Sequence, residues 1–382
     1  MQQIPSLMTM MQELIGAESV SSTLPGLDQS NLGVIAKLES WLSSAGFNCE
    51  VLDVPDQPGK ANLIATLGQG SGGLVLSGHT DTVPYDQGRW NTDPFKLKEQ
   101  DNRLYGLGTC DMKGFFALAI EAARSFLDRP LQQPLIILAT ADEETSMSGA
   151  RALADMGRPK ARYAIIGEPT DMQPVYMHKG MMMHRVRVRG RSGHSSNPAL
   201  GNNALDAMHE VMTELLAFRR EMQQQYQNSA FEVAVPTLNL GCIHGGDSPN
   251  RICGQCELDF DLRPLPGMDN LELRGQVERR LQSVAERCQI ELECEALFPG
   301  IPAFENPLNS ELIRMAESLT GHRAKTVAFG TEGPFLQQLG MDTIVMGPGS
   351  IDQAHQPDEY LDLKQVKPTI AILEQMIARC CL

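Results

Sequence analysis

The sequence predicts an α/β fold that is interrupted by a second, α+β domain. Residues 10–150 alternate apolar strand-like runs with helical segments, the pattern of a central sheet flanked by helices. From about residue 181 the elements change to the order βαββαβ, and after residue 296 helix and strand signals resume. We therefore expect a discontinuous first domain, residues 1–180 and 297–382, with residues 181–296 inserted into it.

The elements of the first domain follow from their apolar patterns. An amphipathic stretch predicts a helix over 31–46, and residues 111–127 carry apolar side chains at the 3.6-residue spacing of a helix packed on a sheet. Helix and strand signals return near the C-terminus, and the predicted strands are the apolar runs 62–68, 73–79, 134–141 and 342–350. In such folds ligands bind where strands end.

The inserted domain shows clearer alternation. Residues 255–263, QCELDFDLR, place Cys256, Leu258, Phe260 and Leu262 on one face of a strand and charged residues on the other. Strands are also predicted at 184–190, 236–243 and 290–297, and helices at about 204–216 and 271–288. The order βαββαβ is that of the ferredoxin-like split motif.

Composition excludes several classes of partner. The chain has 382 residues, 42% hydrophobic and 21% charged, as in ordinary globular proteins, with a net charge of −15. No basic stripe offsets this acidic excess, so nucleic acid and anionic membrane surfaces are disfavoured and a small-molecule partner is expected. The N-terminal residues lack a basic segment followed by an apolar run, so we expect a cytoplasmic protein without a membrane segment.

The cysteines point to reduced thiols. Nine of them, an odd number, are scattered along the chain, which does not indicate a disulfide framework. Cys253 and Cys256 have the CxxC spacing of redox and zinc sites, but no second CxxC or CxxH pair follows. We interpret this pair as structural.

Histidines and acids recur directly after the predicted strands of the first domain. Each has a plain interpretation by itself, such as a helix cap for Asp111 or a surface loop for His355. The full set comprises His79, Asp81, Asp111, Glu143, Glu144, Glu168 and His355. Imidazole nitrogens and carboxylate oxygens are the ligands that zinc-like divalent ions accept, and a carboxylate shared by two ions offsets their repulsion.

The segment LIILATADEET raises a specific electrostatic problem. A buried strand ends there in Asp142, Glu143 and Glu144, whose like charges repel and resist desolvation. A solvated loop would solve this problem, and so would a bound divalent cation. With a cation, one acid can bind the metal while its neighbour stays free to accept a proton.

These motifs resemble those of the aminoacylase and carboxypeptidase-type dinuclear zinc amidohydrolases over nearly the whole chain. The resemblance rests on SGHTDTVPYDQGRW, YGLGTCDMKGFFA, ILATADEETSMSGAR, IIGEPT, SGHSSNPALGNNA, HGGDSPNRICG and GPGSIDQAHQPDEY. It implies a zinc-exopeptidase-like catalytic domain, an inserted lid or dimerisation domain, a homodimer, and two divalent metal ions, zinc or cobalt.

The resemblance also assigns roles to the residues. His79 and Glu168 would bind one ion, Glu144 and His355 the other, and Asp111 would bridge both. Asp81 would orient the His79 imidazole, and Glu143 would be the general acid and base. A cis peptide between Asp111 and Met112 is implied as well.

Further roles fall mainly in the inserted domain. His194 would reach the oxyanion, in dimeric relatives from the neighbouring subunit. Asn250 and Arg263 match positions that hold a substrate carboxylate, although a surface salt bridge is an alternative for Arg263 and Arg251 is a competitor. Thr331 would line the pocket.

The implied activity is metal-assisted hydrolysis of an amide bond. The subfamily motifs, chiefly YDQGRW, HGGDSPNRI and QAHQPDEY, favour N2-acetyl-L-ornithine, cleaved to ornithine and acetate in arginine biosynthesis. N-succinyl-diaminopimelate or a small peptide remains an alternative substrate. A non-catalytic binding relative is disfavoured because Glu143 and every ligand position are present.

Overall fold

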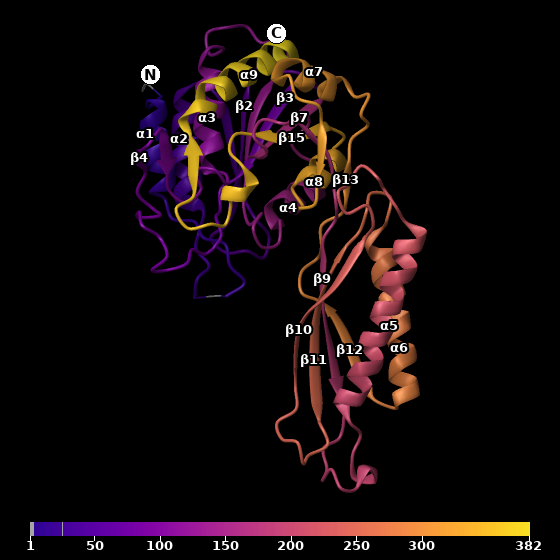
Figure 1. Ribbon diagram of the computed structural model, residues 1–382. Coiled ribbons are helices and arrows are strands. Elements are labelled where there is room, and N and C mark those ends of the chain that lie inside the picture. Colours follow the sequence, from indigo (N-terminus) through magenta and orange to yellow (C-terminus); the bar gives the residue numbers. More distant parts are fainter. Residues whose placement is uncertain (1–3, 25) are drawn as a thin grey trace. The chain divides into compact units, whose positions relative to one another are not determined.

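A computed structural model describes residues 4–24 and 26–382 of the chain (Figure 1). Residues 1–3 and 25, which belong to the expected first domain, lie outside the described residues. The chain forms two compact units. Unit 1 consists of residues 1–176, 306–325 and 331–382, and unit 2 of residues 177–305 and 326–330.

Unit 1 alternates helices and strands as the apolar patterns predict. Its helices are α1 (Leu7–Ile15), α2 (Leu32–Ser44), α3 (Lys113–Arg124), α4 (Ser148–Met156), α7 (Glu311–Thr320), α8 (Gly333–Gln338), the 3-10 turn η2 (Ile351–Gln353) and α9 (Leu363–Cys381). Its strands are β1 (Asn48–Asp53), β2 (Ala61–Leu67), β3 (Leu74–His79), β4 (Lys98–Gln100), β5 (Arg103–Tyr105), β6 (Leu135–Thr140), β7 (Tyr163–Pro169), β15 (Asp342–Gly347) and β16 (Tyr360–Asp362). Two more begin in this unit and run into unit 2: β8 (Val175–His178) and β14 (Lys325–Val327).

The large sheet of unit 1 is mixed. Its strand order begins β1-β2-β6-β3-β7-β15 and continues with β8, which pairs antiparallel with β15. Strands β6, β3, β7 and β15 run parallel, and β2 runs antiparallel to β6. Every residue of β3, β6 and β7 is buried, as expected for central strands covered on both faces. Helix α3 packs on β3 and lies beside α1 and α9 (Figure 1). The predicted α/β class is confirmed.

A close backbone approach fixes how α3 meets this sheet. A Cβ atom at Gly167 of β7 would lie 2.2 Å from the Phe115 ring of α3. The absence of a side chain at Gly167 therefore lets the aromatic ring rest directly on the strand, one residue before Glu168.

Unit 2 has the predicted element order. It contains β9 (Met182–Arg189), the 3-10 turn η1 (Pro198–Leu200), α5 (Ala204–Gln225), β10 (Thr237–Gly245), β11 (Gln255–Arg263), α6 (Asn270–Cys288), β12 (Glu291–Ala296) and the short β13 (Phe304–Glu305). The sheet order is β10-β11-β9-β12 with antiparallel neighbours, the arrangement of a ferredoxin-like fold. Helices α5 and α6 lie side by side along it (Figure 1).

Alternation along β11 decides which face these helices cover. The predicted apolar residues, Cys256 to Leu262 at every second position, are buried. On the other face arginines of β9 pair with acids of β11: Arg185 Nε lies 2.7 Å from Asp259 Oδ1, and Arg187 Nε lies 2.7 Å from Glu257 Oε1. One face is thus apolar core and the other a ladder of cross-strand ion pairs.

Two sequence expectations can be compared directly with the structure. Cys253 and Cys256 are buried free thiols, and among the described residues neither belongs to a group of potential metal ligands, in agreement with a structural role. Within residues 4–24 and 26–382, no helix combines the length and apolarity needed to cross a bilayer.

Candidate metal centre

Strand register brings the predicted ligands to one edge of the unit 1 sheet. In the parallel pair β3 and β6, His79 lies opposite Thr140, so Glu143 and Glu144 follow at the same end. In the pair β3 and β7, Ser77 lies opposite Ile166, which places Glu168 level with His79. The carboxyl ends of adjacent parallel strands therefore collect these side chains, as α/β folds generally do at binding sites.

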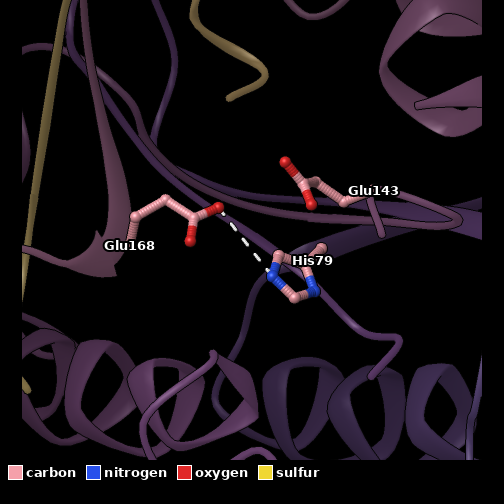
Figure 2. A group of neighbouring side chains, drawn as sticks. All are labelled: His79, Glu143 and Glu168. Atoms are coloured by element: carbon pink, nitrogen blue, oxygen red, sulfur yellow. Dashed lines mark ion pairs between the residues drawn. The ribbon is translucent and has the colours of Figure 1, made fainter. Parts of the chain in front are cut away.

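The side chains meet in two overlapping groups. Ligand atoms of His79, Glu143 and Glu168 lie within 4.8 Å of one another, and so do those of His79, Asp111 and Glu144. Figure 2 shows the first group, in which Glu168 of β7 and Glu143 of the loop after β6 lie near the His79 ring. His79 Nε2 is 3.8 Å from Glu168 Oε1.

Asp111 lies between the two histidines. Its Oδ1 is 3.1 Å from His79 Nε2, and its Oδ2 is 3.5 Å from His355 Nε2. His355 Nε2 also lies 3.1 Å from Glu144 Oε2. Each carboxylate oxygen of Asp111 thus faces a different imidazole, the arrangement required of a bridging ligand. The implied cis peptide between Asp111 and Met112 is present.

The three consecutive acids of the ADEET segment have different environments. Asp142 adopts a left-handed conformation (φ 57°) and forms a buried ion pair with Lys60, Oδ1 to Nζ 2.8 Å. Its carboxylate also accepts hydrogen bonds from the hydroxyls of Ser21 and Ser148. Glu144 faces His355 and Glu143 faces His79, so each of the three adjacent acids has a different partner.

Asp81 contributes to the position of two other segments. The His79 Nδ1 lies 3.0 Å from the main-chain oxygen of Asp81 and 3.6 Å from its Oδ1. The Asp81 carboxylate accepts backbone hydrogen bonds from Glu143 (3.3 Å) and Glu144 (3.1 Å). Asp81 therefore orients the imidazole largely through its carbonyl and holds the acidic loop with its side chain.

The pKa shifts in the cluster reflect burial and an excess of carboxylates over imidazoles. Burial and the Glu168 carboxylate raise the pKa of Glu143 well above its usual value, and burial and Asp111 do the same for the pKa of Glu168. Burial opposes ionisation of Asp111, but hydrogen bonds with His355 and His79 prevail and lower its pKa. The hydrogen bonds of His355 with Asp111 and Glu144 raise its pKa to about 10.

The donor set fits divalent metal ions. In the described part of the chain, Glu168 Oε1 is buried and accepts no hydrogen bond, although it faces the cluster. A buried carboxylate oxygen without a donor is costly, and a cation at this point would offset that cost. Imidazole nitrogens and carboxylate oxygens around a shared aspartate are ligands suited to zinc or cobalt.

The predicted residues of unit 2 form a separate group. Ser195, next to His194, donates its N–H to the main-chain oxygen of Asn250 at 3.1 Å, and the backbone of His194 forms a β-bridge with Arg251. Arg251 pairs with Asp247, and Arg263 Nε lies 2.9 Å from Asp261 Oδ2. Arg263 ends β11 whereas Asn250 precedes its start, so about 26 Å of extended strand separates them.

Residues 331 and 332 are buried in unit 1. Thr331 Oγ1 accepts the N–H of Gly333 at 3.1 Å at the start of α8, and burial raises the pKa of Glu332 to about 7.

Cys110 directly precedes Asp111 in the sequence. It is buried, and its thiol donates a hydrogen bond to the main-chain oxygen of Ser350. Burial raises the Cys110 pKa well above its usual value, which disfavours the thiolate and hence oxidation at this residue.

Lys60 was not predicted from the sequence. It is 3% exposed and lies 2.8 Å from both Asp28 Oδ1 and Asp142 Oδ1. Its segment, QPGKANL, reads as a turn before a strand, where lysine is ordinarily solvated. A signal existed in Asp142 itself, because a buried acid next to two further acids, Glu143 and Glu144, needs a cation of its own.

Comparison with known proteins identifies the family. The model of peptidase family M20/M25/M40 matches residues 75–379, a span that contains the whole cluster from His79 to His355. The chain belongs to this family. It is therefore a metal-dependent hydrolase of amide or peptide bonds, and the His/Asp/Glu cluster can bind the metal ions expected from the sequence.

Solved structures share the fold of this M20 family chain at low sequence identity. A tripeptidase of Staphylococcus aureus subsp. aureus Mu50 is 18% identical, with a TM-score of 0.75 over 97% of this chain and 96% of that one. An M20 family metallo-carboxypeptidase of Sulfolobus solfataricus is 17% identical, with a TM-score of 0.75 over 98% of both chains. A dinuclear metal-binding M20 peptidase of Bacillus subtilis is 16% identical, with a TM-score of 0.67 over 98% and 97%.

Proposed function

We propose that this M20 family member is an acetylornithine deacetylase, which hydrolyses N2-acetyl-L-ornithine to L-ornithine and acetate in arginine biosynthesis. The family supports amide hydrolysis, and the motifs YDQGRW, HGGDSPNRI and QAHQPDEY support this substrate within it. N-succinyl-diaminopimelate and small peptides are the alternative substrates. A cytoplasmic location accompanies this proposal.

The observation that carries the catalytic proposal is the place of Glu143. Its carboxylate lies in the same group as His79 and Glu168, while the neighbouring Glu144 faces His355. His79, Asp111 and Glu168 would hold one ion, and Asp111, Glu144 and His355 the other. This assignment leaves Glu143 as the acid of the cluster without a ligand role.

The protein residues divide the work between binding and proton transfer. Bound divalent ions would polarise the acyl carbonyl and lower the pKa of water. Glu143 would accept the proton of the attacking water and return it to the leaving amine. Burial and Glu168 raise the Glu143 pKa, and a carboxyl group with a raised pKa is better suited to hold and then release a proton near neutral pH.

A homodimer is part of the proposal. His194, Asn250 and Arg251 lie together before β11 begins, whereas Arg263 ends that strand. Asn250 and Arg263 of one chain are too far apart along β11 to hold one carboxylate together. A second copy that supplies His194 and Asn250 would complete a site that uses Arg263 of the first, in the manner of the dimeric relatives.

The direct test measures acetate and free amine released from N2-acetyl-L-ornithine by zinc- or cobalt-loaded protein. N-succinyl-diaminopimelate and a dipeptide serve as competing substrates. Glu143→Gln is compared with Glu13→Gln, which alters a half-exposed ion pair with Lys37. We expect turnover of acetylornithine above the others and a loss of about 10²- to 10⁴-fold in kcat for Glu143→Gln.

The outcomes separate the two parts of the proposal. Turnover of a competing substrate alone would refute the acetylornithine assignment but leave amide hydrolysis in place. Full activity of Glu143→Gln at unchanged metal content would refute the proton-transfer role.

A further inference from the structure

A buried carboxylate outside the ligand set faces the loop that carries Asp111. Glu359 is 1% exposed and directly precedes β16. Its Oε1 accepts backbone hydrogen bonds from Gly108 (3.1 Å), Cys110 (2.8 Å) and Asp111 (3.0 Å). Its Oε2 lies 3.2 Å from the Gly108 nitrogen, and its main-chain oxygen accepts the N–H of Gly106 at 3.0 Å.

The loop needs such an acceptor. Residues 106–111 lie between β5 and α3, are buried, and belong to no helix or strand. Buried N–H groups outside regular secondary structure must find partners or destabilise the fold. Gly108 has a positive φ of 86°. The loop directs the N–H groups of Gly108, Cys110 and Asp111 toward one point, which is an anion-binding concavity.

The position of Glu359 follows from strand pairing. β16 pairs with β5 so that Tyr360 lies opposite Tyr105, which sets Glu359 beside the start of the Asp111 loop. Glu359 is also four residues after His355. One short segment therefore carries one candidate ligand and holds the backbone of another.

The same device occurs on the other side of the cluster. The Asp81 carboxylate accepts the backbone N–H groups of Glu143 and Glu144, just as Glu359 accepts those of Gly108, Cys110 and Asp111. In both cases a buried carboxylate that is not a candidate ligand fixes the main chain of a segment that carries one. Groups of this kind tune metal sites nearly as strongly as the ligands themselves.

We propose that Glu359 is a positioning residue for the metal centre: its carboxylate fixes the backbone of residues 108–111 and so aims the Asp111 carboxylate between His79 and His355. This inference rests on the proposed metal ligands but not on the substrate. Geometry rather than charge is what Glu359 supplies, because a single oxygen receives three N–H groups.

Three substitutions separate geometry from charge. Glu359→Gln keeps an oxygen at the same distance and removes the charge. Glu359→Asp keeps the charge and withdraws the oxygens by about 1.5 Å, one carbon–carbon bond. Glu359→Ala removes the acceptor altogether.

Asp358→Asn is the matched control. The Asp358 carboxylate accepts hydrogen bonds from Asn91 and Thr92, so it holds a different loop from an adjacent position in the sequence. Asp358 has a φ of 56°, a conformation that asparagine tolerates.

The experiment measures Co²⁺ binding to the full-length protein. Competition with a chelating dye gives the affinity, and the visible absorption of the bound ion reports its coordination. We expect Glu359→Asp and Glu359→Ala to lower Co²⁺ affinity by about 10- to 100-fold and to change the absorption band. Glu359→Gln and Asp358→Asn should stay within about threefold of wild type, with the wild-type band. Circular dichroism in chelator establishes that each variant is folded.

The possible failures are distinguishable. If wild-type protein binds no Co²⁺ at the cluster, the proposed metal ligands fail. If wild type binds but folded Glu359→Asp has the same affinity and spectrum, the positioning role is overturned. If Glu359→Ala does not fold, the comparison of Glu359→Asp with Glu359→Gln still tests the proposal. Equally reduced Co²⁺ affinity in both variants would overturn the argument that geometry matters rather than charge.

Discussion

Replacement of Lys60 by methionine tests how the acidic loop is held. Lys60 is 3% exposed and pairs with Asp142, which is 4% exposed, at 2.8 Å. Burial by itself would lower the Lys60 pKa, but hydrogen bonds to Asp142 and Asp28 outweigh it and raise that pKa. Lys60 is therefore protonated at neutral pH, and its loss leaves the buried Asp142 carboxylate with only the hydroxyls of Ser21 and Ser148 as named partners.

The magnitude follows from what each variant leaves behind. Lys60→Met should cost about 3–5 kcal/mol in the free energy of unfolding, because it strands the Asp142 charge. Asp142→Asn should cost less, about 1–3 kcal/mol, because Lys60 retains Asp28 and asparagine tolerates the positive φ. The double variant should lose about 1–3 kcal/mol less unfolding free energy than the sum of the two single losses.

The assay is unfolding in urea, monitored by tryptophan fluorescence. The two tryptophans of the chain, Trp41 and Trp90, both lie in unit 1, so their emission reports on the unit that contains the ion pair. Lys37→Met is the control, because Lys37 pairs with Glu13 at 3.0 Å in a half-exposed setting, and its loss should cost at most about 1 kcal/mol. Additive losses from Lys60→Met and Asp142→Asn, or a loss at Lys60 no larger than at Lys37, would refute the reasoning.

Three further predictions concern other parts of the molecule. Burial lowers the pKa of His178 to about 4, so below pH 6.5 this residue binds a proton in the unfolded chain and not in the folded chain. Its contribution to the unfolding free energy should fall by about 2 kcal/mol from pH 7 to pH 5. Equal pH dependence of wild type and His178→Asn, measured by circular dichroism, would contradict this. Gly167→Ala should destabilise unit 1 by about 1–3 kcal/mol or more because its Cβ meets Phe115, whereas Gly33→Ala, with nothing within 4 Å, should be neutral or stabilising in the same fluorescence assay. Zinc at a thousandfold excess over its Kd should stabilise unit 1 by about 4 kcal/mol, and an unchanged urea midpoint after chelation would argue against binding at the cluster.

Local pattern was enough for most secondary structure. The apolar runs that predict strands at 73–79 and 134–141 are β3 and β6, and the alternation at 255–263 is β11 with its buried face as expected. Period-2 and period-3.6 patterns report burial directly, since each residue's face follows from its position along the chain. The order βαββαβ likewise sufficed for the ferredoxin-like unit.

The sequence by itself also determined which residue types gather at the centre. Parallel strands share a direction, so His79, Glu143, Glu144 and Glu168 gather at one end of β3, β6 and β7. Asp111 and His355 reach the same cluster from the loops before α3 and β16. Their metal and proton-transfer roles stay predictions drawn from resemblance.

Tertiary structure alone decided how that centre is supported. Lys60 reaches Asp142 across 82 positions of sequence, and Glu359 accepts the N–H groups of Cys110 and Asp111 from nearly 250 positions away. Neither contact has a local signature, since a lysine in a turn and an acid before a strand are ordinary surface patterns. Strand order and register bring these charges to their partners, and both depend on pairings between distant segments that no local period encodes.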